Sequence, residues 1–270
     1  TDDVYFRASC VGSAADTTEL VIAGWTTDAT RYIEWFTPTG HANGRFTGSA
    51  FSTTTYRIER VSSGSACLQV QEENVRIIGL AVRKEKAASV DKFAFYVPSG
   101  IGAGDVRFLK CIAKGVYTSG SDAHGGFAFY DSSPTYRVNN CLAYDFSGAS
   151  GKGFEQASFA PLYIYNSGAH NCVTGFGGGG TFDDTHVRNS WAQSCTTCFS
   201  ATWHANSDYN IAEDTTAPGT NSKDSTAISF TNEASDDFTL DAGDTAALNE
   251  GESLNGVTGW VTDEDILEVA

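Results

Sequence analysis

The stretch AHNCVTGF (residues 169–176) returns 23 residues later, in looser form, as AQSCTTCF (residues 192–199). Alanine, cysteine, threonine and phenylalanine recur at the same offsets in both copies. A phrase that repeats at such a distance is typical of a chain built from stacked structural units. The question it raises is whether each unit is helical or strand-like.

A second pattern extends the repeat over most of the chain. Four eight-residue segments share one frame, with an apolar residue in second place and alanine in seventh place. They are RFLKCIAK (107–114), RVNNCLAY (137–144), YIYNSGAH (163–170) and HVRNSWAQ (186–193), preceded by a shorter copy, RIIGLAV (76–82). The copies start 31, 30, 26 and 23 residues apart. Periods between about 20 and 50 residues predict a solenoid or another repeat architecture.

Alternation of apolar residues indicates that the unit is strand-like. Tyr136 and Val138 lie two residues apart, as do Leu162 and Ile164, and no apolar stripe at helical spacing is sustained. Strand-forming valine, isoleucine, tyrosine and threonine are frequent, and glycine and asparagine interrupt the segments. Units of variable length around a constant strand core predict a parallel β-helix of about six or seven coils, whose loops absorb the differences in length.

Stacking of the coils explains why particular residues recur. Equivalent residues of successive coils lie about 4.8 Å apart, so a residue that packs well on itself returns along a column. The predicted columns are Asn140 with Asn166 and Asn189, Cys172 with Cys195, and Phe176 with Phe199. The asparagines are expected to form an internal ladder of side-chain amides, extended by Asn210.

Two segments resemble a known superfamily. CLQVQEENVRIIGLAV (67–82) resembles the first full coil, and ISFTNEASDDFTLDAGDTAALNEG (228–251) the closing segment, of right-handed parallel β-helix proteins. These proteins form the pectate-lyase-like superfamily, and the likeness is to its secreted and phage-encoded members. The resemblance implies an all-β, single-stranded, right-handed solenoid with capping segments at both ends. Members include polysaccharide lyases, glycoside hydrolases, tail spikes and adhesins, so the fold alone assigns no function.

Within this architecture the chain divides into three parts. Residues 1–60 are expected to form N-terminal strands and a cap, residues 61–212 the coils, and residues 213–270 an acidic closing coil and tail. No apolar run is long enough to cross a membrane, so no membrane insertion is expected. The seven cysteines are an odd number, which leaves at least one thiol without a partner in the chain.

Charge is distributed unevenly along the chain, whose net charge is −16. Residues 213–270 hold 14 acidic residues and one basic residue, Lys223, a net charge of −13. Residues 76–114, in contrast, form a basic band with eight lysines and arginines. An acidic chain of this kind lacks the cation clusters that phosphate contacts need, so no nucleic-acid partner is expected. The acidity fits an extracellular, cell-surface or virion location.

The best match to hydrolase chemistry is TFDDTHVRN (181–189). Two neighbouring carboxylates beside a histidine match the general acid and base of glycoside hydrolases. This gives four candidate catalytic residues: Asp183, Asp184, His186 and Arg188. The alternative is structural, because adjacent acids in a turn commonly cap or solvate it.

Three further groups are candidate ligand sites. SDAHGGFAFYD (121–131) contains Asp122, His124 and Asp131, with an ordinary surface role as the alternative. Trp203 and His204 carry rings of the kind on which sugars stack, with packing at the edge of the core as the alternative. The closing segment supplies the carboxylate oxygens that calcium prefers, without the glycine-marked regularity of calcium loops. These acids are Asp236, Asp237, Asp241 and Asp244, and no other cofactor is expected.

Two classes of function stay open. The first is a structural protein of an extracellular or virion surface, which self-assembles as a filament, spike or decoration. The alternative is a carbohydrate-active enzyme, a polysaccharide lyase or glycoside hydrolase, with a polysaccharide bound along one face of the solenoid. The segregation of charge along the chain, and the lack of a catalytic pattern spanning neighbouring coils, favour the first class.

Assembly is expected to involve the ends of the solenoid, where strands have unpaired N–H and C=O groups. The C-terminal segment VTDEDILEVA (261–270) either folds back on its own body or adds as a strand to a neighbouring subunit. In the second case the acidic residues 213–270 approach the basic band of the next molecule. Repetition of that contact makes a homo-oligomeric ring or a filament.

Overall fold

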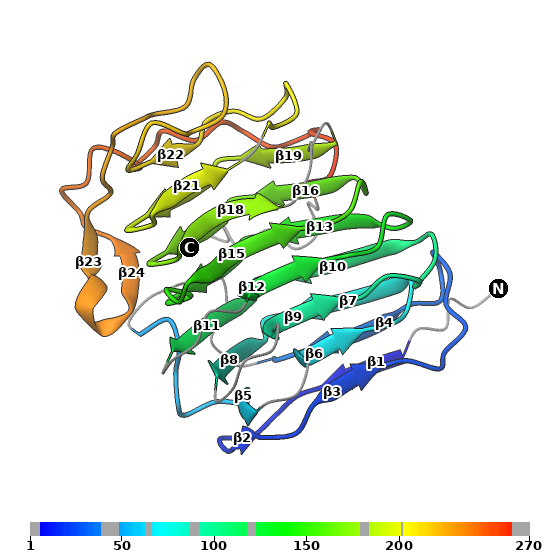
Figure 1. Ribbon diagram of the computed structural model, residues 1–270. Coiled ribbons are helices and arrows are strands. Elements are labelled where there is room, and N and C mark those ends of the chain that lie inside the picture. The colour runs from blue at the N-terminus through cyan, green and yellow to red at the C-terminus, as the bar shows by residue number, and fades with distance from the viewer. Residues whose placement is uncertain are drawn as a thin grey trace.

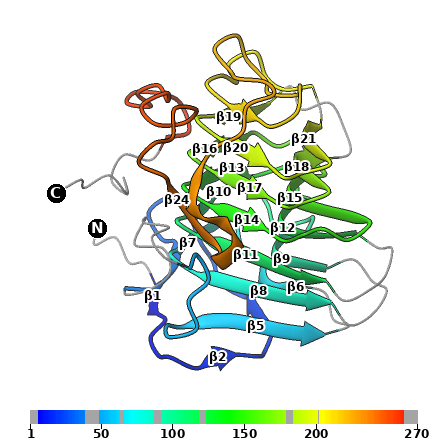
Figure 2. The ribbon, with the colours of Figure 1, turned by 90° about the vertical axis from the view of Figure 1, so that its left-hand side faces the viewer.

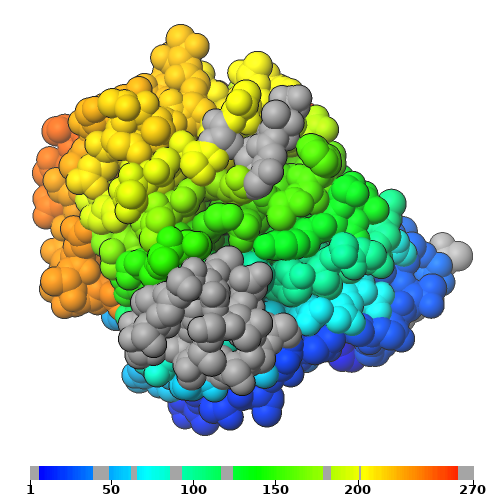
Figure 3. All heavy atoms as spheres, viewed as in Figure 1, coloured from blue at the N-terminus to red at the C-terminus, as the bar shows by residue number. Residues whose placement is uncertain are grey.

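The chain folds as a parallel β-solenoid of about six turns with three parallel sheets, so the predicted all-β fold class is confirmed. This computed structural model describes residues 6–38, 49–62, 66–86, 92–117, 123–178, 184–200 and 202–260. Figure 1 shows the strands of successive turns side by side, from blue at the N-terminal end of the stack to yellow and orange at the other. The same order appears as coloured bands across the molecular surface (Figure 3).

From its first strand to β21 (Thr197–Ser200), the chain visits the three sheets in a constant order, sheet A, then sheet B, then sheet C. Sheet A contains β1 (Phe6–Ser9), β4 (Ile33–Phe36), β7 (Asn74–Ile78), β10 (Asp105–Leu109), β13 (Thr135–Asn139), β16 (Leu162–Tyr165) and β19 (Thr185–Arg188). Sheet B contains β2 (Ala15–Asp16), β5 (Arg57–Ser62), β8 (Ala81–Lys86), β11 (Ile112–Tyr117), β14 (Leu142–Tyr144), β17 (Gly168–His170), β20 (Trp191–Gln193) and β22 (Ile211–Ala212). Sheet C contains β3 (Leu20–Ile22), β6 (Ala66–Val70), β9 (Lys92–Val97), β12 (Ala123–Phe129), β15 (Ser150–Gln156), β18 (Thr174–Gly178) and β21 (Thr197–Ser200).

The pairing register of sheet A reproduces the repeat frame of the sequence. Arg76 lies opposite Arg107, and Arg107 lies opposite Arg137. Tyr163 follows in the next coil and His186 in the one after it. These are the first residues of the five copies, so the predicted spacings are those of the coils. The apolar residues in second place face inward and are buried.

The N-terminal part of the chain belongs to the solenoid itself. β1, β2 and β3 pair in parallel with β4, β5 and β6, so residues 6–22 form a complete coil. This terminal coil lies at the lower end of the stack in Figure 1. Among the described strands, β1, β2 and β3 are each paired on one side only.

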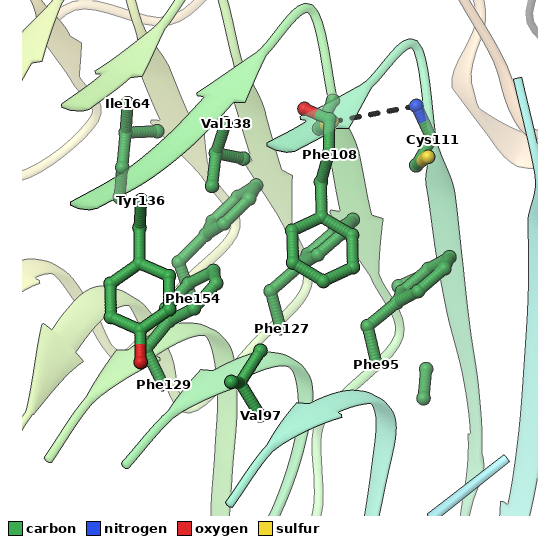
Figure 4. Close-up of a cluster of buried hydrophobic side chains, with 14 of the residues drawn as sticks. Phe95, Val97, Phe108, Cys111, Phe127, Phe129, Tyr136, Val138, Phe154 and Ile164 are labelled. Atoms are coloured by element: carbon green, nitrogen blue, oxygen red, sulfur yellow. Dashed lines mark hydrogen bonds between the residues drawn. The ribbon is translucent and has the colours of Figure 1, made fainter. Parts of the chain in front are cut away.

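A column of phenylalanine rings fills the core beneath sheet C. Phe95, Phe127, Phe154, Phe176 and Phe199 stack with successive centroid distances of 4.6, 5.0, 4.7 and 4.8 Å, and their planes differ by 5° or less. The predicted stacking of the last two rings is thereby confirmed. Figure 4 shows the first three rings in a row, with a ring of sheet A packed against them. The column gives the core one continuous apolar contact along the stack.

Sheets B and C approach each other closely where a column of alanines faces a column of glycines. Gly126, Gly153 and Gly175 occupy equivalent positions in β12, β15 and β18. A Cβ atom on Gly153 would lie 3.2 Å from the Cβ of Ala169 and 2.6 Å from the carbonyl oxygen of Gly175. The absence of a side chain in this column therefore sets the distance between the two sheets.

The closing segment returns along the outside of the solenoid. It contains an antiparallel hairpin of β23 (Phe230–Asn232) and β24 (Asp237–Leu240), joined by the 3₁₀ turn η1 (Glu233–Ser235). Figure 2 shows this hairpin lying across sheet B. Trp191 contacts Phe230, and Tyr144 contacts Phe238, with ring centroids 4.9 and 5.2 Å apart. Within the described ranges, the structure has no helix with the length and apolar character needed to cross a membrane.

Candidate functional site

The predicted asparagine column lies at the turn between sheets A and B. Asn140, Asn166 and Asn189 occupy equivalent turn positions with φ values of 58°, 49° and 49°, in the left-handed region. Asparagine tolerates this backbone conformation better than most residues do. The main-chain N–H of each asparagine donates to a carbonyl oxygen of the next coil, at 2.9 Å from Asn140 to Tyr165. Backbone geometry therefore explains why asparagine recurs here.

The hydrogen-bonded ladder of side chains lies one residue further along the chain than predicted. The N–H of Cys111 donates to Sγ of Cys141, and the N–H of Cys141 to Oγ of Ser167. The N–H of Ser167 donates to Oγ of Ser190, and the N–H of Ser190 to Oδ1 of Asn210. These four contacts span 3.1–3.4 Å. The ladder therefore consists of thiol, hydroxyl and amide acceptors, and of the predicted asparagines it contains only the last.

Two substitutions at Asn166 separate a backbone role from a side-chain role. Asn166→Ala is expected to lower the free energy of unfolding by about 1 kcal/mol, because positive φ is unfavourable for alanine. Asn166→Gly is expected to cost less than half as much, because glycine adopts this conformation freely. Chemical denaturation of the three proteins measures both differences. Equal losses in the two variants would show that the amide group itself stabilises the turn.

Cys172 and Cys195 occupy equivalent positions of successive coils, because Thr174 lies opposite Thr197. Both are free thiols; Cys172 is buried and Cys195 is partly exposed. Hydrogen bonding to the thiol of Cys172 raises the pKa of the Cys195 thiol. A raised pKa disfavours the reactive thiolate of Cys195, and burial makes Cys172 a small core residue.

Three of the four candidate catalytic residues lie in a row on the outer face of sheet A. Asp184, His186 and Arg188 alternate with two buried residues, as expected for side chains that share one face of a strand. The fourth, Asp183, lies outside the described residues. A paired-carboxylate mechanism needs two carboxyl groups, and in the described part of the row Asp184 provides one of them.

His186 belongs to a stack of three rings on this face. Its imidazole lies 4.7 Å from the ring of Tyr163 and 3.9 Å from that of His204, measured between centroids. Burial, reinforced by His204, lowers the pKa of His186 to about 4, and the carboxylate of Asp184 opposes the shift without reversing it. The imidazole is therefore neutral near pH 7, which suits stacking better than general acid catalysis.

The lowered pKa of His186 predicts that stability depends on pH. The unfolded chain binds a proton at this imidazole near its ordinary pKa of 6.5, whereas the folded chain does so only near pH 4. The contribution of His186 to stability is therefore complete above about pH 6.5 and is lost as the pH falls towards 4. His186→Gln is expected to flatten the curve of unfolding free energy against pH over this window. An equally steep curve in the variant would contradict the assignment.

Arg188 fastens the closing segment to the outside of sheet A. Its guanidinium pairs with the carboxylate of Glu252 and donates to the carbonyl oxygen of Asn206. The side chain of Asn189 adds two hydrogen bonds with the backbone of Glu252, at 2.9 and 3.0 Å. The hydrogen-bonding groups of this guanidinium are used within the fold, and Arg188 anchors the closing segment to sheet A.

Trp203 and His204, the candidate sugar-binding residues, close the C-terminal end of the stack. Trp203 packs edge-on against Phe199, with centroids 6.0 Å apart and planes at 81°, and so covers the last ring of the phenylalanine column. The N–H of His204 donates to the carbonyl oxygen of Thr185, and its Nδ1 accepts the N–H of Asn206. Both residues thus contribute contacts that close this end.

The second candidate cluster has separate surroundings for its members, and Asp122 lies outside the described residues. The carboxylate of Asp131 accepts the N–H of Ser133 at 2.8 Å, as in an Asx turn. His124 is buried, with its ring centroid 6.1 Å from that of Phe146. Asp131 therefore stabilises a turn, and His124 packs against the core.

The four acids considered for calcium have different partners. Asp237 and Asp241 each accept the N–H two residues further on. Burial would raise the pKa of the Asp244 carboxyl, but four main-chain N–H groups donate to it and lower the pKa below its ordinary value. Asp236 pairs with Lys114. In the part of the chain that the structure describes, no three His, Cys, Asp or Glu side chains are arranged to hold a metal ion.

The acidic closing segment contacts the basic band of its own chain. Asp236 forms an ion pair with Lys114 of this band, and outside the band the carboxylate of Glu233 contacts Nε2 of His170. At Asp236, the acidic closing segment therefore contacts the basic band within one molecule, a contact that strand addition would place between neighbouring molecules. Residues 261–270, which are expected to supply the assembling strand, lie outside the described residues.

The strand edges at the C-terminal end of the solenoid are covered. Residues 204–208 form main-chain hydrogen bonds with the edge of β19, and residues 223–226 with that of β22. Two N–H groups of β21 donate to side-chain oxygens of Asp214 and Thr216, at 2.8 and 2.9 Å. All three sheets therefore have bonded edges at this end.

The N-terminal end differs, because its terminal coil and the connection that follows it expose large apolar side chains. Phe6, Val11, Val21 and Trp25 are 42%, 67%, 45% and 51% exposed. The rings of Phe6 and Trp25 contact each other, with centroids 4.8 Å apart. Within the described residues, no strand lies beyond β1, β2 and β3. Phe6, Val11 and Trp25, together with these three strand edges, are called the end surface below; Val21 alternates with the inward-facing Leu20 and Ile22 and so faces the outside of sheet C.

Comparison of the chain with protein-family models, with curated proteins and with solved structures finds no match. The β-solenoid is therefore established from its own strands and register. The resemblance to the pectate-lyase-like superfamily stays a prediction, and the candidate residues are assessed by their geometry.

Proposed function

We propose that this protein is a structural β-solenoid of an extracellular or virion surface, which self-assembles through its end surface. The observation that supports the proposal is the difference between the two ends of the stack. One end has bonded edges on all three sheets. At the other end, the edges of β1, β2 and β3 have no partner strand among the described residues, and aromatic and aliphatic side chains are exposed. Unpaired strand edges promote pairing with another chain, and exposed apolar patches mark sites of interaction.

The contacts of the candidate catalytic row favour this proposal over a carbohydrate-active enzyme. Arg188 is bound to Glu252, and His186 is stacked between two rings with a lowered pKa. These side chains already hold the closing segment and the end of sheet A in place. The structural proposal accounts for Arg188 and His186 without assigning them a catalytic role as well.

Light scattering over a range of protein concentrations tests the proposal. The unsubstituted chain is expected to reach at least twice the mass of a single chain. Trp25→Lys is expected to stay single, because assembly would bury an unpaired charge. Leu248→Lys is the matched control, since Leu248 is 45% exposed against 51% for Trp25 but lies in the closing segment. A single chain at every concentration, or equal losses in both variants, would contradict the proposal.

A further inference from the structure

The end surface is suited to contact with its own copy rather than with the opposite end of another molecule. In residues 202–227, which cover the other end, the exposed residues are small or polar and include Asn206, Thr220 and Asn221. Burial of apolar side chains against apolar groups lowers the free energy. Polar groups that are buried against apolar side chains lose hydrogen bonds to water, which raises it. A head-to-tail contact would place Phe6 and Trp25 on this polar surface. It would also set the edges of β1, β2 and β3, which have no second partner within the described ranges, against edges that already have partners.

The charges of the two ends lead to the same conclusion. The described residues from 6 to 62 hold four arginines and five acidic residues, which is close to neutral. The arginines are all paired within this region: Arg7 with Glu34, Arg31 with Asp28, Arg57 with Glu59, and Arg60 with Glu19. Two end surfaces can therefore meet without strong repulsion. Residues 202–226, which cover the other end, hold four acidic residues and one basic residue, so two covered ends repel each other more strongly.

We infer that the end surface binds the end surface of a second copy, so that the protein forms a closed two-fold dimer. The inference rests on the proposed function and narrows it. A two-fold axis makes the contact isologous, because each terminal coil meets its own counterpart. Where the axis is normal to a sheet, the facing edge strands of that sheet run antiparallel, and their free N–H and C=O groups can pair. The contact occupies both end surfaces, so assembly stops at two chains and no filament grows.

Crosslinking between introduced surface cysteines distinguishes this dimer from a head-to-tail assembly. Val11→Cys places a thiol on the end surface, at a side chain that is 67% exposed, and Thr220→Cys places one at the covered end. Six native cysteines are buried and Cys195 is partly exposed, so the unsubstituted chain, treated in parallel, gives the background. A flexible bifunctional maleimide joins thiols that are near each other without being in contact.

Val11→Cys alone is expected to give crosslinked dimers at several times the background yield, and nothing larger. Ala23→Cys, at a second exposed position beside β3, is expected to do the same. A mixture of Val11→Cys and Thr220→Cys chains is expected to give no mixed product above background. Mixed products, or a ladder of larger species, would overturn the dimer and leave the proposed function standing. A single chain in light scattering at every concentration would overturn both.

Discussion

Phe127→Ala is expected to lower the free energy of unfolding by about 3–5 kcal/mol. The side chain is completely buried, and its ring stacks between those of Phe95 and Phe154, with centroids 4.6 and 5.0 Å away. Truncation removes both contacts and leaves a cavity in the middle of the column. The strand hydrogen bonds hold the coils at a fixed spacing, so the cavity cannot close. Chemical denaturation measures the loss.

Phe159→Ala is the matched control for this experiment. The side chain of Phe159 is 71% exposed, so its removal is expected to change the free energy of unfolding by less than about 0.5 kcal/mol. A loss at Phe127 no larger than the loss at Phe159 would mean that the ring column is not the core of the fold.

The second large effect is expected at Gly153, where one added methyl group is enough. A Cβ atom there would lie 2.6 Å from the carbonyl oxygen of Gly175 and 3.2 Å from the Cβ of Ala169. Both neighbours belong to strands that are paired on either side, so neither can move without disturbing a sheet. Gly153→Ala is therefore expected to lower the free energy of unfolding by about 3 kcal/mol, near the upper end of typical overpacking costs.

Gly243→Ala is the control for this substitution, measured by the same denaturation. Gly243 is exposed, and a Cβ atom there would meet only the flexible carboxylate of Asp241, at 3.2 Å. Its effect is expected to be below about 0.5 kcal/mol. If Gly153→Ala were as stable as the unsubstituted chain, sheets B and C would have to lie further apart than described.

The register of the solenoid could be predicted because the repeat frame fixes which residues face inward. A slip of one residue between coils would turn Phe108 and Val138 outward, and Arg107 and Arg137 into the core. A slip of that kind is energetically costly, so the shared frame and the strand pairing agree. The varying intervals between copies mattered little, because loops outside the strand core absorb them.

The side-chain ladder was missed because its members differ in residue type. Cys111, Cys141, Ser167 and Ser190 each follow a turn residue with positive φ. Each has a small side chain with one acceptor atom, and the recurrence of this property at one position of the repeat could have predicted the ladder. The asparagines one position earlier look more alike, but a backbone conformation explains their recurrence.

The end surface and the state of the candidate site depend on long-range geometry that no local pattern reveals. Phe6 lies in register with Ile33 and Val75, which are buried, and it is partly exposed because its coil is the last one among the described residues. Arg188 is engaged because the chain returns to it 64 residues later with Glu252. The closing segment has no repeat from which its path could be predicted.

Hydrogen–deuterium exchange at the terminal coil is the most direct test of assembly through the end surface. The N–H groups of β1 and β3 are expected to become more protected as the protein concentration rises, because pairing with a second chain shields them. The N–H groups of residues 204–208, at the covered end, are expected to exchange at the same rate throughout. Exchange at β1 and β3 that does not change between low and high concentration would contradict the account.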